Sequence, residues 1–234
     1  MARFYVESGD SLTGGDFHHA VNVLRLGLGE EIEIVQGLGL RFKAKLTKID
    51  NNLKEAKFEV IEKINVSTEP PATLTLIMGI PRPDKLPEII EYCTQLGVSK
   101  FVLAKCARSQ TDAGRIDKKI DHFQKIAKSA AELAGREVIP TIEEPTTLAM
   151  ALTKAKGLRL IPWELEAETT IGKAFQPCTE VTTCIGPEGG LERAEIEMAK
   201  AQGFVPVTLG KRILRAQLAP VVAVSQVLAF LENL

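Results

Sequence analysis

A glycine-rich segment, Cys184–Leu191, is the part of the sequence whose residue types most clearly indicate chemistry. It places three glycines and a proline around Glu188, after an apolar strand and before a helix. In an open α/β sheet, ligands bind at loops beyond the carboxyl ends of the strands. Glycines let the backbone approach a ligand closely, and the proline stiffens the loop. A tight turn needs only one glycine, so this composition favours a binding loop.

A second candidate segment, Leu209–Arg215, also follows a predicted strand, and it is basic. Lys211, Arg212 and Arg215 lie close together beside Gly210. Clustered cations of this kind suit a phosphate backbone or an anionic ligand. A solvated basic turn explains the charges equally well, so both interpretations stay open.

Two further arginines are candidates for contacting phosphate. Arg108 follows a predicted strand, and phosphate contact and a structural role fit it equally well. Arg136 lies at the end of a predicted helix, where a cation offsets the helix dipole. For Arg136 the structural role is therefore the stronger interpretation.

Several common site motifs are missing. Gly27–Gly29 and Gly37–Gly39 lack the third glycine of a dinucleotide-binding loop, and Gly210-Lys211 is followed by Arg212 rather than the Ser or Thr of a P-loop. There is no GxSxG nucleophile elbow. The four cysteines form no CxxC pair, so we expect no metal site. We expect the cysteines to be free thiols in a reducing cytoplasm.

Composition sets broad limits on the function. Of 234 residues, 45% are hydrophobic, while 29 Lys and Arg nearly balance 30 Asp and Glu. This excludes a globally basic protein that coats nucleic acid, but it permits local basic surfaces. The sequence shows neither a signal peptide nor a membrane span, so we expect a cytoplasmic protein without membrane contact.

The elements that must position these loops fall into two halves, separated by a linker at Thr68–Pro71. In residues 1–70, alternating strands flank a glycine turn at Gly37–Gly39, and a helix capped by Asp16 is predicted over Asp16–Leu26. This half predicts a small β-barrel. In residues 71–234, strands alternate with helices, which predicts a mostly parallel α/β sheet.

Taken together, the segments resemble one family, the small-subunit ribosomal RNA uridine-N3 methyltransferases (RsmE type) of the SPOUT class. The specific matches are IGPEGG at Ile185–Gly190 and LG-x-RILR at Leu209–Arg215. Weaker matches occur in the family's order at His18–Arg25, at Thr94–Val98 and at Arg108 with its following serine. The resemblance covers most of the chain.

The resemblance implies a fold that the hydropathy pattern alone does not predict. Residues 1–70 would form a PUA-like RNA-binding β-barrel, and residues 71–234 an α/β SPOUT domain with a C-terminal trefoil knot. Such proteins bind S-adenosyl-L-methionine in the knot, at a homodimer interface, which explains the missing dinucleotide motif. The implied cofactor-binding residues are Ile161, Pro162, Ile185, Gly186, Pro187, Glu188, Gly189, Gly190, Leu209, Gly210, Ile213 and Leu214.

The implied reaction is methyl transfer from S-adenosyl-L-methionine to N3 of a uridine in 16S rRNA of the small ribosomal subunit, with S-adenosyl-L-homocysteine as product. Donor and acceptor must be aligned, and the N3 proton must leave. Arg215 would stabilise negative charge on the pyrimidine carbonyls, while Glu188 would take a proton or only hold its loop. The implied RNA-binding residues are Arg25, Arg108, Arg136, Lys211 and Arg212.

The chain departs from the family pattern beside this implied site. The family's T-E-T after RILR is Ala216-Gln217-Leu218 here, which removes two hydroxyls and a carboxylate, and Pro220 would restart the next helix. Two functions therefore compete: an active methyltransferase, or a divergent paralogue that binds RNA or cofactor with lost or altered activity. A third, an α/β enzyme acting on a small anionic substrate, leaves the N-terminal barrel unexplained.

Overall fold

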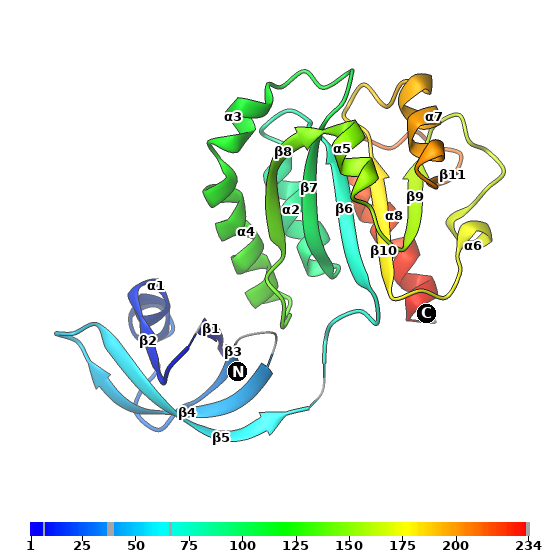
Figure 1. Ribbon diagram of the computed structural model, residues 1–234. Coiled ribbons are helices and arrows are strands. Elements are labelled where there is room, and N and C mark those ends of the chain that lie inside the picture. The colour runs from blue at the N-terminus through cyan, green and yellow to red at the C-terminus, as the bar shows by residue number, and fades with distance from the viewer. Residues whose placement is uncertain (7, 37–39, 66, 233–234) are drawn as a thin grey trace. The chain divides into compact units, whose positions relative to one another are not determined.

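The computed structural model describes residues 1–6, 8–36, 40–65 and 67–232, and it divides the chain into two compact units (Figure 1). The first unit contains Met1–Glu69 together with Glu132–Val138. The second contains Pro70–Ala131 and Ile139–Leu234. The return of a short later segment to the first unit is a feature that a single boundary near residue 70 does not anticipate.

The first unit is built on a five-stranded sheet in the order β1-β3-β4-β5-β2, whose edge strands also contact each other, so the sheet is barrel-like. Among the strand pairs within the described part of this unit, β1–β3 is parallel and the others are antiparallel. Alternating residues such as Ile32 and Ile34 point into a core that Phe4, Leu12 and Phe58 complete. The strands are β1 (Arg3–Val6), β2 (Ser11–Thr13), β3 (Glu31–Gln36), β4 (Leu40–Asp50) and β5 (Glu55–Ile64).

The predicted helix over Asp16–Leu26 differs from the helix that forms. An α-helical turn, α1 (Gly14–Phe17), begins two residues earlier, with Thr13 at its N-cap, and continues as a π-helix, η1 (His18–Val23). Phe17 at the end of α1 and Ala20 within η1 are both buried in the core. The predicted turn at Gly37–Gly39 lies outside the described residues.

A buried ion-pair network supports the first unit. The carboxylate of Glu33, which is 7% exposed, pairs with Arg3 at 2.9 Å and with Arg41 at 2.5 Å. Arg41 also pairs with Glu137 at 3.2 Å, so the network ties the segment Glu132–Val138 to the sheet. Burial by itself would raise the pKa of Glu33, but hydrogen bonds from the two arginines outweigh it and leave the pKa lowered.

We expect Glu33→Gln to lower the free energy of unfolding by about 3 kcal/mol at pH 7, because it leaves two buried cations short of an anion. Since the folded-state pKa of Glu33 is depressed, its contribution is present above the unfolded-state pKa of about 4.3 and is lost as the pH falls through the folded-state value. Urea unfolding at pH 7 and pH 3.5 should therefore show a smaller acid-induced loss in the variant. Glu31→Gln, on the same strand but half exposed and paired with Lys43, is the control, and an equal loss in both variants would contradict a special role for Glu33.

The second unit is a six-stranded parallel sheet in the order β11-β9-β10-β6-β7-β8, with helices on both faces (Figure 1). Successive residues of β6 point to opposite faces: Leu76 and Met78 enter one core, and Ile77 enters the other. The strands are β6 (Thr73–Gly79), β7 (Val98–Lys105), β8 (Thr141–Thr147), β9 (Leu158–Pro162), β10 (Glu180–Ile185) and β11 (Val205–Val207).

The helices of this unit divide between the two cores. Residues of α2, α3, α4, α6 and α8 contribute to the larger one, and residues of α5 and α7 contribute to the smaller one. Their bounds are α2 (Leu86–Gln95), α3 (Ala113–Asp117), α4 (Ile120–Leu133), α5 (Leu148–Thr153), α6 (Ile171–Ala174), α7 (Arg193–Ala201) and α8 (Leu218–Leu231). No helix within the described residues is long and apolar enough to cross a membrane.

The arrangement of β9, β10 and β11 creates the place for a site. These strands are neighbours in the sheet, and all run in parallel, so the loops that follow them meet at one edge. Both sequence motifs, IGPEGG and RILR, lie in those loops. The strand order fits the trefoil-knotted SPOUT fold that the sequence motifs imply.

Candidate active site

The loop after β10 takes a conformation that depends on its glycines. A Cβ added to Gly186 would lie 2.9 Å from Leu191 Cγ, and Gly190 has a φ of +71°, which side chains disfavour. The Gly190 N–H donates to the Pro187 carbonyl at 2.9 Å and closes a tight turn. The glycines are therefore required by the close packing of the loop on its own neighbours and by a positive φ.

Pro187 packs directly on the end of β6. A Cβ on Gly79 would lie 2.6 Å from Pro187 Cδ and 2.9 Å from Cys106 Sγ, so only glycine fits there. Burial raises the pKa of Cys106 to about 12, with a contribution from the charge of Glu195. The thiol therefore stays protonated at neutral pH and has a packing role rather than a nucleophilic one.

Glu188 is held by the loop that follows β6. Its Oε1 accepts a hydrogen bond from the backbone N–H of Arg82 at 3.0 Å and lies 3.6 Å from the Arg82 Nε. Of the two roles considered for Glu188 from sequence, proton acceptor or loop support, these contacts favour loop support.

Arg108 lies against the same glycine loop. Its Nη1 donates to the Gly189 carbonyl at 3.0 Å, and its Nε is 3.5 Å from Glu192. A Cβ on Gly189 would be 3.0 Å from the Arg108 Cβ, so the two residues pack closely. Of the two interpretations open for Arg108, these contacts support the structural one.

The loops after β9 and β11 complete the edge. The Trp163 N–H donates to the Val207 carbonyl at 3.0 Å and joins the two strand ends. Gly210 has a φ of +117°, and the apolar Ile213 is 81% exposed rather than packed in the core. Ile161 and Ile185 are buried, so they can contribute only backbone groups.

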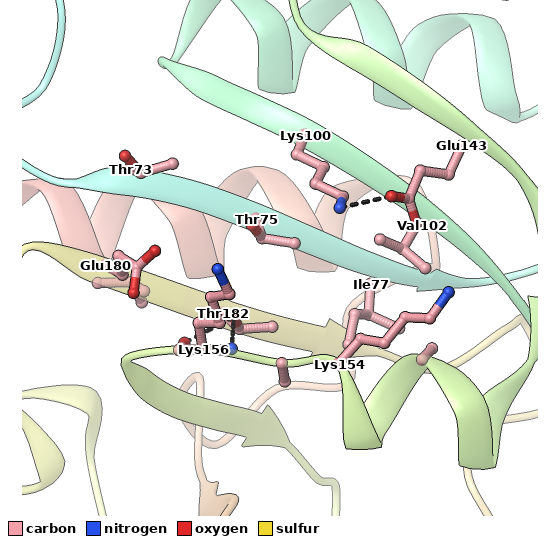
Figure 2. A pocket seen from close by; sticks show the side chains of 13 residues that line it. Thr73, Thr75, Ile77, Lys100, Val102, Glu143, Lys154, Lys156, Glu180 and Thr182 are labelled. Carbon is pink, nitrogen blue, oxygen red and sulfur yellow. Dashed lines mark hydrogen bonds and ion pairs between the residues drawn. The ribbon is translucent and has the colours of Figure 1, made fainter.

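A pocket of about 160 Å³ lies elsewhere on the sheet, and Figure 2 shows its lining. Thr73 and Glu180, which begin β6 and β10, place it at the amino ends of the strands, opposite the motif loops. Lys100 in its wall pairs with Glu143 at 2.5 Å, and the Thr182 hydroxyl donates to the Lys156 carbonyl at 2.8 Å. This pocket is therefore distinct from the candidate site.

Comparison with known proteins decides the family. The model of an RNA methyltransferase domain matches residues 68–228, and that of an RNA methyltransferase PUA domain matches residues 12–59. The chain belongs to the RNA methyltransferase family. A ribosomal RNA small subunit methyltransferase E from Synechocystis is 32% identical, over 97% of this chain and 75% of the relative.

Solved structures support the same assignment of this RNA methyltransferase. The small subunit methyltransferase E from Neisseria gonorrhoeae, bound to S-adenosyl methionine, is 29% identical, with a TM-score of 0.89 and 98% of each chain covered. A putative methyltransferase from Legionella pneumophila, in complex with the same cofactor, is 27% identical, with a TM-score of 0.85. The match covers 97% of this chain and 96% of the Legionella chain. The PUA-like and SPOUT fold expected from the sequence motifs is thereby confirmed.

The predicted RNA-binding residues of the methyltransferase occupy different surroundings. Arg25, with a φ of +58°, is exposed on the first unit, and Lys211 and Arg212 are exposed on the second. Arg136 is 2% exposed, its guanidinium pairs with Glu69, and its carbonyl accepts a hydrogen bond from Arg3. The structure thus gives Arg136 a buried structural role, and the prediction that it contacts RNA is not supported.

Two residues beside the site were not anticipated from sequence. Trp163 and Glu164 follow β9, and a Cβ on Gly190 would lie 3.1 Å from the Glu164 Oε1. Their position in the sequence could have indicated them, because a polar or aromatic residue that follows β9 lies at the same sheet edge as the glycine loop after β10.

The departure at Ala216-Gln217-Leu218 is accommodated by packing. Ala216 is 8% exposed and belongs to the larger core, and Gln217 occupies the N-cap of α8 without a side-chain cap. The Arg215 carbonyl instead accepts the N–H groups of Leu218 and Ala219, both at 2.9 Å. Pro220 lies in the first turn, as predicted. The Arg215 side chain remains exposed.

Proposed function

We propose that this RNA methyltransferase methylates N3 of a uridine in 16S rRNA of the small ribosomal subunit, with S-adenosyl-L-methionine as the methyl donor. The observation that carries the proposal is that the IGPEGG and RILR loops follow β10 and β11, the two strands that flank β9 in the parallel sheet, and so lie at the same carboxyl edge. The relatives named methyltransferase E, and the cofactor-bound structures among them, support it.

The residues present fit the cofactor. Gly186, Gly189 and Gly190 give the loop a compact backbone without side chains, and the exposed Ile213 offers an apolar surface for the adenine ring. The set that would hold the cofactor is Ile161, Pro162, Ile185, Gly186, Pro187, Glu188, Gly189, Gly190, Leu209, Gly210, Ile213 and Leu214. When bound, S-adenosyl-L-methionine supplies a methyl group already activated by its sulfonium, and S-adenosyl-L-homocysteine is the product.

The chain's own residues have two tasks in this reaction. The target uridine must leave its stack to be reached, and the exposed cations Arg25, Lys211 and Arg212 would each contact phosphates. The exposed Arg215 guanidinium then stabilises the negative charge that the pyrimidine carbonyls carry as the N3 proton passes to solvent water and the methyl group bonds to N3. Glu188, held by Arg82, keeps the loop in shape.

We further propose that the protein is cytoplasmic and acts as a homodimer. Phe230 and Leu218 of α8 are 44% and 47% exposed, and Ile213 nearby in sequence is more exposed still. Exposed apolar side chains on and before one helix suit a second copy of the chain. Sedimentation equilibrium of the purified protein should give twice the monomer mass.

Methyl transfer to small ribosomal subunits that lack the uridine methylation tests the function. The RNA is digested after incubation with radiolabelled S-adenosyl-L-methionine, and the labelled nucleoside is identified. Label in 3-methyluridine is expected. The absence of label, with an active relative working in parallel, would favour the second candidate, a divergent paralogue, for which the specific observation is Ala216-Gln217-Leu218 in place of T-E-T.

A further inference from the structure

One buried carboxylate joins two loops beside the site. Glu195, in the first turn of α7, is 8% exposed. Its Oε1 accepts the N–H of Ala107 at 2.8 Å, and its Oε2 accepts the N–H of Glu192 at 2.8 Å. The second contact is an ordinary helix cap, whereas the first reaches across to the segment that follows β7.

The segment that Glu195 reaches, Cys106–Ser109, is itself fixed. The Ser109 Oγ accepts the Cys106 N–H at 3.2 Å, and the Ser109 N–H donates to the Cys106 carbonyl at 3.1 Å. The Lys105 ammonium donates to the carbonyls of Ser109 at 3.2 Å and Thr111 at 2.9 Å. These bonds make Cys106–Ser109 a rigid anchor.

Residues of this anchor contact the glycine loop Gly186–Gly190 and the strand end on which it packs. Arg108 donates to the Gly189 carbonyl and packs its Cβ on the Gly189 backbone. Cys106 lies beside Gly79, where Pro187 also packs. Because a loop rich in glycine has high conformational entropy, contacts that fix it reduce the ordering that ligand binding must supply.

We propose that Glu195 and Arg108 are positioning residues that hold Gly186–Gly190 in its cofactor-binding conformation through the anchor Cys106–Ser109. The inference rests on the proposed function, since it assigns these residues to the same cofactor loop. A hydrogen bond to a charged carboxylate is stronger than a neutral one, and a glutamine amide cannot accept both N–H groups through two oxygens.

The test compares Glu195→Gln with Glu197→Gln, an exposed carboxylate on the same helix that pairs with Lys200. We expect Glu195→Gln to raise the Kd for S-adenosyl-L-methionine roughly tenfold, about 1.4 kcal/mol, with kcat at saturating cofactor within twofold of wild type. Glu197→Gln should match wild type. Arg108→Ala should also weaken binding, and the double variant should lose less than the product of the single losses.

Hydrogen exchange of the Gly190 amide without cofactor provides a second readout. This N–H is bonded to the Pro187 carbonyl, and its exchange should quicken in Glu195→Gln and in Arg108→Ala. Unchanged exchange and unchanged cofactor affinity in both variants would overturn the proposal and leave Glu195 as a helix cap. If wild type binds no cofactor, the proposed function fails, while the exchange rates still decide whether these residues order the loop. If Glu195→Gln does not fold, Arg108→Ala carries the test. The Arg108 side chain is half exposed, so its removal should leave the fold intact.

Discussion

Arg215→Ala is expected to lower the single-turnover rate of methyl transfer by about 10²–10³-fold at saturating cofactor, because one donor to a developing negative charge contributes on that order. Affinity for S-adenosyl-L-methionine should stay within about threefold of wild type, since the proposed role is directed at the uridine. The rate of Arg215→Lys should lie between those of Arg215→Ala and wild type, because lysine keeps the charge but lacks the planar pair of donors. Quench-flow with labelled cofactor and small subunits measures the rate.

The matched control for this prediction is Arg193→Ala, an exposed arginine at the start of α7. It should transfer methyl groups at the wild-type rate, which separates a loss of local chemistry from a loss of general positive charge. A rate for Arg215→Ala within threefold of wild type would remove Arg215 from catalysis. An effect confined to the KM for the ribosomal subunit would reassign it to RNA contact.

The two motif loops of the candidate site could be placed from sequence because their main signals are local. The strand, the glycine loop and the helix that follows are contiguous, and so are β11, Gly210 and Arg215, so hydropathy and residue type were enough to place them at one sheet edge. Ile213 is the exception: an apolar loop residue is ordinarily expected to pack in the core, but Ile213 is 81% exposed. An apolar side chain in a loop gives no sequence signal for that difference.

The partners of Arg108 and Arg136 could not be predicted in the same way, because they are distant in sequence. Gly189 lies 81 residues from Arg108, and Glu69 lies 67 residues from Arg136. The local sequence shows only that each arginine follows a helix or a strand. The fold brings the Gly189 carbonyl to Arg108 and the Glu69 carboxylate to Arg136. Burial of Arg136 is possible because Glu69 neutralises it.

Element boundaries failed where tertiary context outweighed local propensity. The apolar spacing of Pro145–Ala155 predicts a helix that begins at the proline. Pro145 instead lies inside β8, which tolerates it because β8 is an edge strand of the sheet. Helix α5 begins only at Leu148, where the Thr147 hydroxyl accepts the Met150 N–H at 3.2 Å. The cap, rather than the proline, sets the start of this helix.

Gly79→Ala is the second change for which we expect a large effect. The added methyl would meet Pro187 Cδ at 2.6 Å and Cys106 Sγ at 2.9 Å, closer than packed carbons and sulfur approach each other. Neither neighbour can rotate away freely, because Pro187 is a ring in a tight turn and Cys106 is buried in the anchor. We expect the cofactor loop to shift, the Kd for S-adenosyl-L-methionine to rise at least tenfold, and the free energy of unfolding to fall by about 1–3 kcal/mol.

Calorimetric binding and urea unfolding measure both consequences, with Gly15→Ala as the control. Gly15 lies in α1 with no atom near its added Cβ and no positive φ, so alanine there should leave cofactor affinity unchanged. A second change, Cys106→Ala, removes one of the two clashing side chains and should restore part of the affinity when combined with Gly79→Ala. Wild-type affinity in Gly79→Ala alone would show that the cofactor does not depend on the position of Pro187, and the candidate site would then have to be built on the loops after β9 and β11 without it.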